Sequence, residues 1–210
     1  MMAQPTPTRQ RLIDEGMRLF AQHGFHATSV GDIEAAAGLQ PRRGALYKHF
    51  PSKHALLEAA LRTHLDSAAT GAAQLNELGL ASLAGTDRRL LQPMVLGLGR
   101  WFLDEMDRLE SLTRVLEQDG RRLAELTVEV KTNIVDLSYH SAAALIAVVA
   151  PEANDPQATA VLLLGALVAL RRTAWTFGSP PLGIDDARAL TAWAELTLVT
   201  LDALANEEHT

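Results

Sequence analysis

The sequence contains no cysteine. Disulfide bonds, thiolate metal sites and cysteine nucleophiles are therefore excluded, and the composition is compatible with a reducing compartment. The first eleven residues lack the apolar stretch of a signal peptide, and the longest apolar run, residues 160–170, has eleven residues. A helix needs about 20 apolar residues to span a bilayer. We therefore expect a soluble, cytoplasmic protein with no membrane partner.

Recognisable catalytic motifs are absent as well. The sequence has no Ser/His/Asp motif, no phosphate-binding glycine loop and no dinucleotide fingerprint. His23 and His26 have the spacing of a metal-ligand pair, but Gly24 is expected to end a helix between them, so the two imidazoles should not share a face. His49 and His54 are separated by a proline and a helix start. We expect no metal site, no cofactor and no enzymatic activity.

Negative charge dominates the chain as a whole, with a formal net charge of −6, but its distribution is uneven. Residues 1–64 carry eight Lys and Arg against five Asp and Glu, together with five of the seven histidines. The remaining 146 residues carry eleven basic and twenty acidic side chains. Because nucleic acids attract basic surfaces, the N-terminal part is the candidate DNA-binding part.

Apolar residues recur at intervals of three and four along almost the whole chain, and no segment alternates as a strand does. The fold class is therefore predicted to be all-α. Thr8 and Asp155 are predicted N-caps, Ser29 and Asp32 have the spacing of a capping box, and glycines and prolines mark the other ends of the predicted helices. These helices cover residues 8–24, 29–38, 41–50, 52–61, 91–109 with a short piece to 120, 121–150, 156–177 and 185–205, and the Ala- and Gly-rich residues 68–86 are expected to fray into a loop.

The first three predicted helices have the outline of a helix-turn-helix, because the middle one is short and is joined to the next by a glycine turn. Phe20 and Gly24 close the first helix, Ala37 and Gly38 end the second, and the string GALYKHFPSK follows at residues 44–53. In this order of residues the chain resembles the TetR family of DNA-binding repressors over about a quarter of its length. The resemblance implies an N-terminal three-helix domain, here residues 8–51, and a larger C-terminal helical bundle, here residues 52–206.

One departure from the family pattern concerns the turn before the third helix. The family usually has five residues between the glycine after the second helix and the Leu-Tyr pair, whereas residues 39–45 make seven here. The two extra residues either lengthen the third helix, with Pro41 at its first position, or bulge from the turn. The sequence does not decide which of Gln40, Arg42 and Arg43 would point at bases.

The third predicted helix is rich in Arg, Lys and His and is short enough to lie in a major groove, although a solvated basic helix would look the same. By resemblance, Tyr47 sets its hydroxyl on a phosphate. Lys53 and the hydroxyls at the start of the second helix are expected to hold phosphates too. The predicted DNA-binding residues are Thr28, Ser29, Gln40, Arg42, Arg43, Gly44, Ala45, Tyr47, Lys48, His49 and Lys53. Phe20, Ile33, Leu46 and Phe50 are assigned to the small core.

The helix predicted over residues 121–150 places Asn133 and His140 seven residues apart, on one face beside an apolar stripe. In TetR-like proteins the corresponding bundle encloses an apolar pocket with a few polar groups, and the resemblance implies such a pocket for an unknown small-molecule effector here. Each candidate residue has the alternative of being plain core or surface. The predicted effector-binding residues are Trp101, Phe102, Asn133, Tyr139, His140 and Trp175.

The last two predicted helices are apolar over more than one stripe, so they must be covered on more than one side. Gly165 and Ala169 would allow a close approach of another helix. A monomer core could supply the cover, but the resemblance implies a four-helix homodimer interface made by these two helices of each subunit. The predicted interface residues are Val161, Leu164, Val168, Trp175, Trp193 and Leu201.

The sequence thus predicts a ligand-responsive transcriptional repressor that binds double-stranded DNA at a near-palindromic operator and is released by a mainly apolar effector. Activation in place of repression is left open. The alternatives are a TetR-like protein without a small effector, a helical-bundle enzyme and a purely structural dimerisation module. The missing acid-base cluster argues against the enzyme, and the basic N-terminal part argues against the structural module.

Overall fold

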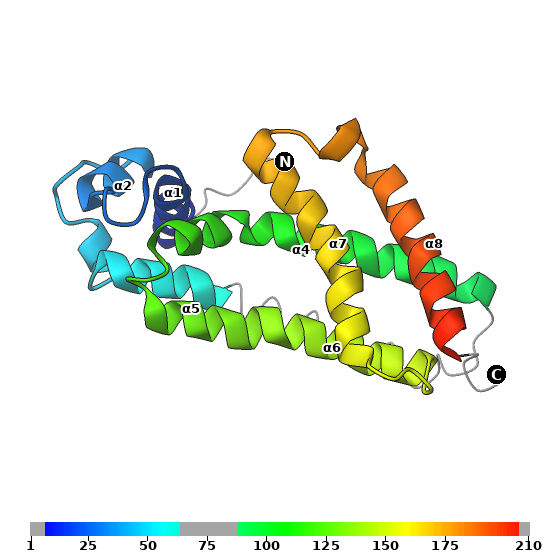
Figure 1. Ribbon diagram of the computed structural model, residues 1–210. Helices are drawn as coiled ribbons and strands as arrows, with labels where there is room; N and C mark the ends of the chain where they lie inside the picture. Colours follow the sequence, from blue (N-terminus) through cyan, green and yellow to red (C-terminus); the bar gives the residue numbers. More distant parts are fainter. Residues whose placement is uncertain (1–6, 64–87, 206–210) are drawn as a thin grey trace. The chain divides into compact units, whose positions relative to one another are not determined.

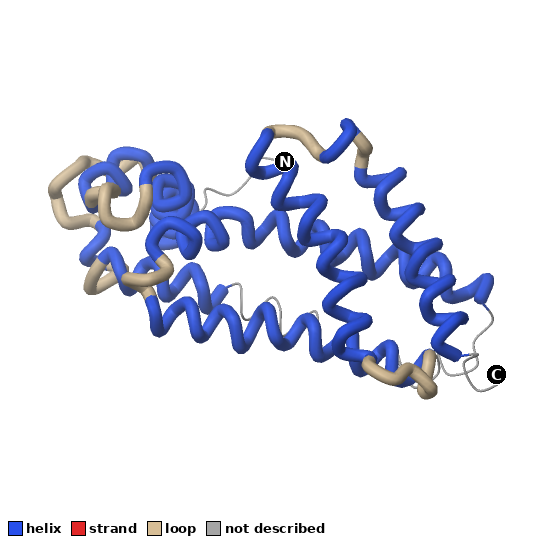
Figure 2. Tube along the Cα trace, viewed as in Figure 1, coloured by secondary structure: helices blue, strands red, loops and turns tan. Residues whose placement is uncertain are grey.

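The structure, a computed structural model, describes residues 7–63 and 88–205. Within these two ranges the chain consists of helices and the turns between them, with no strand (Figure 1, Figure 2). The predicted all-α fold class is therefore confirmed. Residues 68–86, predicted to fray into a loop, lie outside the described part of the chain.

The chain divides into two compact units, and each unit combines two separate stretches of sequence. The described part of unit 1 consists of residues 7–63 and 109–133, and that of unit 2 consists of residues 88–108 and 134–205. Unit 1 therefore contains more of the chain than residues 8–51. The functional boundary after Pro51 stays a prediction.

Unit 1 is built around a small apolar core. Its elements are α1 (Thr8–His23), α2 (Val30–Ala36), the 3-10 helix η1 (Leu46–Lys48), a helix over residues 53–63, the end of α4 (Arg88–Asp119) and α5 (Ala124–Val130). The four predicted core residues, Phe20, Ile33, Leu46 and Phe50, are all buried. Leu56 and Leu57 of the 53–63 helix and Leu112 and Val115 of α4 are buried as well, so both stretches of sequence contribute buried side chains to this unit.

Local capping sets the ends of the first two helices. α1 ends at His23 because Gly24 takes a φ of 85°, which strongly favours glycine. The N-cap of α1 is Pro7, so the predicted N-cap Thr8 is instead the first helical residue. At the start of α2, the Asp32 N–H donates to the Ser29 hydroxyl and the Ser29 N–H donates to the Asp32 carboxylate. The predicted capping box is therefore confirmed.

The helix predicted over residues 41–50 is wrong in extent, because only Leu46–Lys48 form a 3-10 helix. Before it, Arg42 has a φ of 60° and Gly44 a φ of 71°, and neither value fits a right-handed helix. Pro41 therefore does not start a helix. The extra residues lie in the turn, which was the second of the two alternatives.

Unit 2 contains the start of α4, α6 (Leu137–Val149), α7 (Pro156–Phe177), the 3-10 helix η4 (Pro181–Gly183) and α8 (Asp186–Ala205). One apolar cluster joins α6 to α7 through Ala143, Ile146, Ala160 and Leu163. A second cluster joins α4, α7 and α8 through Leu103, Leu167 and Leu190. Because α7 takes part in both clusters, it is the central packing element of this unit.

An ion-pair network ties three helices of unit 2 together. The guanidinium of Arg171 on α7 donates to both carboxylate oxygens of Asp186 at the start of α8, over 2.8 and 2.9 Å. The same guanidinium lies 3.0 Å from the Asp107 carboxylate of α4. These hydrogen bonds raise the pKa of Arg171 and lower that of Asp186, since each favours the charged form.

For the helices from α4 onward, the caps agree with the sequence better than the lengths do. The Asp155 side chain accepts from the Ala158 N–H at the start of α7, and left-handed Gly178 ends that helix, as expected from their residue types. α4 is continuous to Asp119, so the predicted break after residue 109 is wrong. The helix predicted over residues 121–150 is α5, a π-helical turn η3 (Lys131–Asp136) and α6.

Two helical stretches, Ala124–Val149 and Pro156–Phe177, are long and apolar enough to cross a membrane by length and composition. The expectation of no membrane partner rested on uninterrupted apolar runs, and a helix with occasional polar residues passes the more permissive test. Helices that pack in a core or between subunits pass the same test. Length and hydropathy alone therefore do not assign these helices to a bilayer.

Candidate nucleic-acid interface

The turn before η1, together with η1 itself, presents a mostly polar and basic surface on unit 1. Tyr47, Lys48 and His49 are exposed, and Tyr47 retains 60% of its accessible area. Leu46 and Phe50, on either side of them, are buried in the core. Gln40, Arg42 and Arg43 in the turn are exposed too, and Gly44 and Ala45 are half-buried. The fold therefore anchors the segment by its apolar residues and leaves its polar ones free for a partner.

Arg42 lies against the start of α2. Its Cγ atom would be 3.4 Å from a Cβ placed on Gly31, which is the distance of an ordinary van der Waals contact. Its charge helps to lower the pKa of Asp32, although the hydrogen bonds from Ser29 contribute more to that lowering. The turn thus brings a guanidinium to the same end of α2 as the Ser29 cap.

Glu34 connects α2 to η1 through a hydrogen bond. Its Oε1 accepts the backbone N–H of Leu46 over 3.0 Å, and the side chain is completely buried. Glu34 was not among the predicted site residues. Nothing in the local pattern marks it, because its partner lies twelve residues further along the chain.

Two predicted phosphate ligands face inward instead of outward. The Thr28 hydroxyl is buried and bonds the carbonyl oxygens of Leu19 and Gly24. The Lys53 ammonium donates to the carbonyl oxygens of Phe25 and Thr28 and lies 4.4 Å from the centre of the Phe25 ring. Burial lowers the pKa of Lys53, an effect that nearby Asp119 opposes. Ser29 is exposed, but its hydroxyl is engaged by Asp32.

The end of α4 holds the loop between α1 and α2. The Asp119 carboxylate, which is buried, accepts the Phe25 N–H over 2.7 Å. The neighbouring Gln118 donates to the carbonyl oxygen of Ala21. Neither residue was among the predicted site residues, because both contacts join positions more than 90 residues apart. The loop before Ser29 is therefore fixed by a distant helix.

The structure does not place the six effector candidates in one described cavity. Asn133 in η3 and His140 in α6 are exposed, and Asn133 belongs to unit 1 while the other five belong to unit 2. The expected shared face assumed a regular α-helix, whereas η3 is π-helical and shifts the helical phase between the two positions. Trp101, Phe102, Tyr139 and Trp175 are half-buried, and Phe102 packs against the Leu103 cluster.

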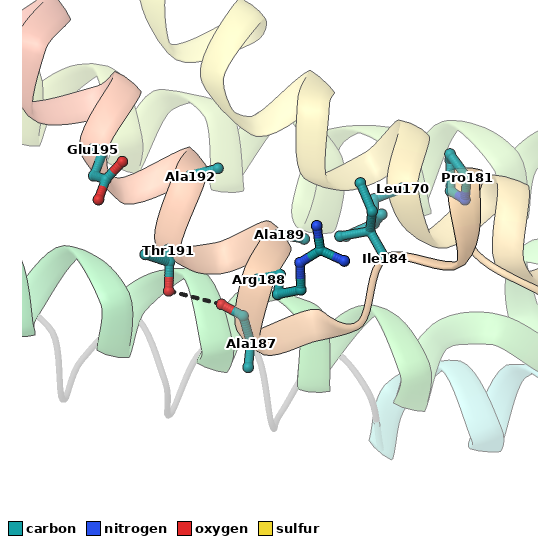
Figure 3. Close-up of a pocket in the computed structure, with 9 residues that line it drawn as sticks. All are labelled: Leu170, Pro181, Ile184, Ala187, Arg188, Ala189, Thr191, Ala192 and Glu195. Atoms are coloured by element: carbon teal, nitrogen blue, oxygen red, sulfur yellow. Dashed lines mark hydrogen bonds between the residues drawn. The ribbon is translucent and has the colours of Figure 1, made fainter.

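An open groove of about 580 Å³ lies in unit 2 where α7, η4 and α8 meet. Figure 3 shows its lining, which is mainly apolar and includes Leu170, Pro181 and Ile184, with Arg188 and Glu195 as its two charged residues. None of the six effector candidates lines it. Among the described residues, no group of three or more His, Asp and Glu could hold a metal ion.

The predicted interface residues of α7 and α8 divide between the inside and outside of unit 2. Leu164 is buried, Leu201 packs against the α6–α7 cluster, and Trp193 Nε1 donates to the carbonyl oxygen of Leu163 over 2.8 Å. Val168 and Trp175 are half-buried, and Val161 is exposed. Leu164 thus lies in the interior of the chain, and Trp193 and Leu201 are half-buried against its apolar clusters.

Exposed apolar residues outside the six predicted interface residues follow the helical period. On α7, Leu162, Ala166 and Ala169 are exposed at spacings of four and three, and the space beside Gly165 is open. On α8, Ala192, Leu196 and Val199 are exposed at the same spacings. This periodicity is visible in the sequence, but the sequence does not show which of several apolar stripes is left uncovered.

Comparisons with known proteins add to this geometry. Residues 12–60 match the family described as bacterial regulatory proteins, tetR family. The HTH-type transcriptional repressor KstR2 of Mycolicibacterium smegmatis is 31% identical over 121 residues, which are 52% of this chain and 55% of that protein. The chain spans about half the length, or less, of the first curated relatives that it matches.

Two solved structures share the fold over nearly the whole chain. The fatty acid degradation regulator FadR from Bacillus halodurans has a TM-score of 0.60 at 19% identity and covers 99% of this chain and 100% of its own. The flavonoid-responsive regulator FrrA has a TM-score of 0.61 at 20% identity, with 92% and 94% covered. At these identities the likeness concerns the fold, which is therefore that of TetR-like regulators.

Proposed function

We propose, from the premise that this chain is a transcriptional regulator of the TetR family, that it represses transcription as a homodimer released from DNA by a small effector. The observation that carries the proposal is the exposed set Tyr47, Lys48 and His49, held over buried Leu46 and Phe50 inside the part that matches the family. A short segment anchored in this way fits a major groove. The operator would be near-palindromic, since the partner subunit presents the same segment.

Base recognition would rest on the exposed cations of the turn and of η1. Arg42, Arg43 and Lys48 can donate to guanine or to phosphates, and His49 can reach either. Tyr47 would place its hydroxyl on a phosphate. Thr28 and Lys53 would act indirectly, because their polar atoms hold the loop that leads to Ser29. Ser29 and the start of α2 remain candidates for a phosphate contact.

Homodimerisation would use the uncovered faces of α7 and α8. The apolar side chains of Leu162, Leu196 and Val199 are more than half exposed in one chain. A second copy that presents the same faces would bury them in a four-helix arrangement. This use explains the apolar length of α7 without a membrane and agrees with a cytoplasmic protein.

The effector site belongs to unit 2 in this proposal. That unit holds the half-buried aromatic side chains Trp101, Phe102, Tyr139 and Trp175. The same fold serves a regulator described as flavonoid-responsive, which supports an apolar effector class without identifying the compound. The alternative is a TetR-like regulator without an effector, and the effector titration described next distinguishes the two.

The experiment that tests the proposal selects duplexes from a random pool with the purified protein and measures affinity against salt concentration. We expect an enriched near-palindrome, with log K falling by about 0.9 for each neutralised phosphate per unit of log salt. Failure to enrich any sequence would contradict the proposed function.

A second measurement tests the effector. A compound that releases the operator must bind the free protein more tightly than it binds the DNA complex. The ratio of these two affinities equals the factor by which the compound weakens DNA binding. Equal affinities would favour a regulator without that effector.

A further inference from the structure

The burial of the Glu34 carboxylate has a free-energy cost for the folding of unit 1. Its side chain has no exposed area, and among the described residues its Oε1 accepts only the Leu46 N–H, while its buried Oε2 has no hydrogen-bond partner. Burial of a carboxylate costs free energy unless its oxygens are satisfied. An apolar side chain of similar size would cost less at this position. The bond to Leu46 is therefore the contribution of Glu34 that calls for an explanation.

The segment that Glu34 holds cannot fix its own orientation. η1 has three residues, and the turn before it contains two residues with positive φ, Arg42 and Gly44. A helix of this length gains little from its internal hydrogen bonds. Its position depends on the burial of Leu46 and Phe50 and on the hydrogen bond from Leu46 to Glu34.

The bond acts directly next to the exposed set. Leu46 precedes Tyr47, and the bond from its N–H to a carboxylate is of the charge-assisted kind, which is about twice as strong as a neutral one. Burial of the Leu46 side chain keeps the segment against the core. It does not fix the rotation of the segment, because apolar contacts have no preferred direction. A hydrogen bond to the backbone adds the missing direction.

We propose that Glu34 is a positioning residue that sets the orientation of Tyr47, Lys48 and His49 and thereby the base preference of the protein. This inference rests on the proposed function, in which those three side chains contact DNA. Glu34 itself touches no DNA, because it is buried beneath the segment. Its loss changes which bases are preferred and leaves the general attraction of the basic surface to DNA in place.

The test compares three substitutions of Glu34 with wild type by measuring affinity for the selected operator and for a random duplex at one salt concentration. Glu34→Gln keeps an oxygen that accepts the Leu46 N–H, so its ratio of specific to random affinity should stay within about threefold of wild type. Glu34→Leu removes the acceptor and should lower the ratio by about tenfold or more, the scale of one lost base contact. Glu34→Asp keeps the charge but withdraws the oxygens by about 1.5 Å, and should also lower the ratio.

Glu105→Leu is the matched control. Glu105 is also a buried carboxylate with one oxygen that has no partner in the described ranges, but it belongs to unit 2 and its other oxygen bonds Arg108. Its substitution should leave the specificity ratio unchanged. An unchanged ratio in a folded Glu34→Leu protein, or an equal fall in Glu105→Leu, would overturn the proposal. If Glu34→Leu does not fold, an unchanged ratio in Glu34→Asp would overturn it.

Amide hydrogen exchange of Leu46 and Tyr47 supplies a reading that does not involve DNA. Exchange of the Leu46 N–H should rise about tenfold or more in Glu34→Leu relative to wild type and Glu34→Gln, since the amide loses its acceptor. Unchanged exchange would overturn the proposal even if DNA binding changed. A wild-type protein that binds operator and random duplex equally would instead contradict the proposed function, and exchange would still decide whether Glu34 holds the segment.

Discussion

At the scale of single residues, Lys48 and Lys53 have the same side chain and opposite environments. Lys48 is exposed beside Tyr47, whereas the Lys53 ammonium bonds two backbone carbonyl oxygens and lies over the Phe25 ring. Both were predicted to contact DNA from the sequence. Only the structure separates them, because the acceptors of Lys53 lie more than twenty residues earlier in the chain.

Alanine substitution should therefore affect the two lysines differently. Lys53→Ala leaves two carbonyl oxygens without their donor and should lower the free energy of unfolding by about 1–3 kcal/mol. Lys48→Ala should change it by no more than about 0.5 kcal/mol and relax base preference instead. Urea unfolding and duplex binding measure the two effects. Equal stability of both variants would contradict the inward role of Lys53.

The Arg171–Asp186 pair predicts a dependence of stability on pH. Asp186 has a lowered pKa in the folded chain because Arg171 bonds its carboxylate. The pair's contribution is thus present above the ordinary aspartate pKa and is lost as the pH falls through the lowered folded value. Asp186→Asn should be less stable than wild type at pH 7, and the difference should shrink below about pH 4. Thermal unfolding from pH 7 to 2 measures it, and a constant difference would contradict the assignment.

At the scale of elements, the sequence predicts best those features that depend on neighbours along the chain. The Ser29 capping box, the Asp155 cap and the end of α1 at Gly24 each depend on residues within one turn of the helix. The 41–50 helix failed because Arg42 and Gly44 adopt positive φ in a turn longer than the family's usual one. The Leu46–Glu34 and Phe25–Asp119 bonds could not be predicted, since each joins separate elements.

Substitutions on the exposed faces of α7 and α8 test the proposed homodimer. Leu162→Glu and Leu196→Glu each place a carboxylate on a face that the second copy would bury, so both should give monomers without loss of helix. Val128→Glu is the control, because Val128 is 64% exposed on α5 in unit 1. Sedimentation equilibrium gives the oligomeric state and circular dichroism the helix content. Dimers in both α7 and α8 variants would rule out these faces, as would a monomeric wild-type chain.

At the scale of the whole molecule, unit 1 depends on a part of the chain that follows the family-matching segment by many residues. Phe25 donates its N–H to Asp119, Gln118 bonds Ala21, and Leu112 and Val115 contribute buried side chains. A fragment of residues 1–69 should therefore unfold without a cooperative transition. Calorimetry on this fragment and on the full chain tests the expectation, and a sharp transition in the fragment would contradict it.

The division of unit 1 between two stretches of sequence also affects which chimeric proteins can fold. Because the described unit 1 is assembled from residues 7–63 and 109–133, we expect that residues 12–60 would not fold if they alone were transferred to another protein. A chimera that joins the N-terminal segment of this chain to the C-terminal part of another regulator would bring a foreign side chain to the position of Asp119. Productive chimeras should then be those that also carry over the last three turns of α4, and a donor chosen by likeness of the N-terminal segment alone would often fail.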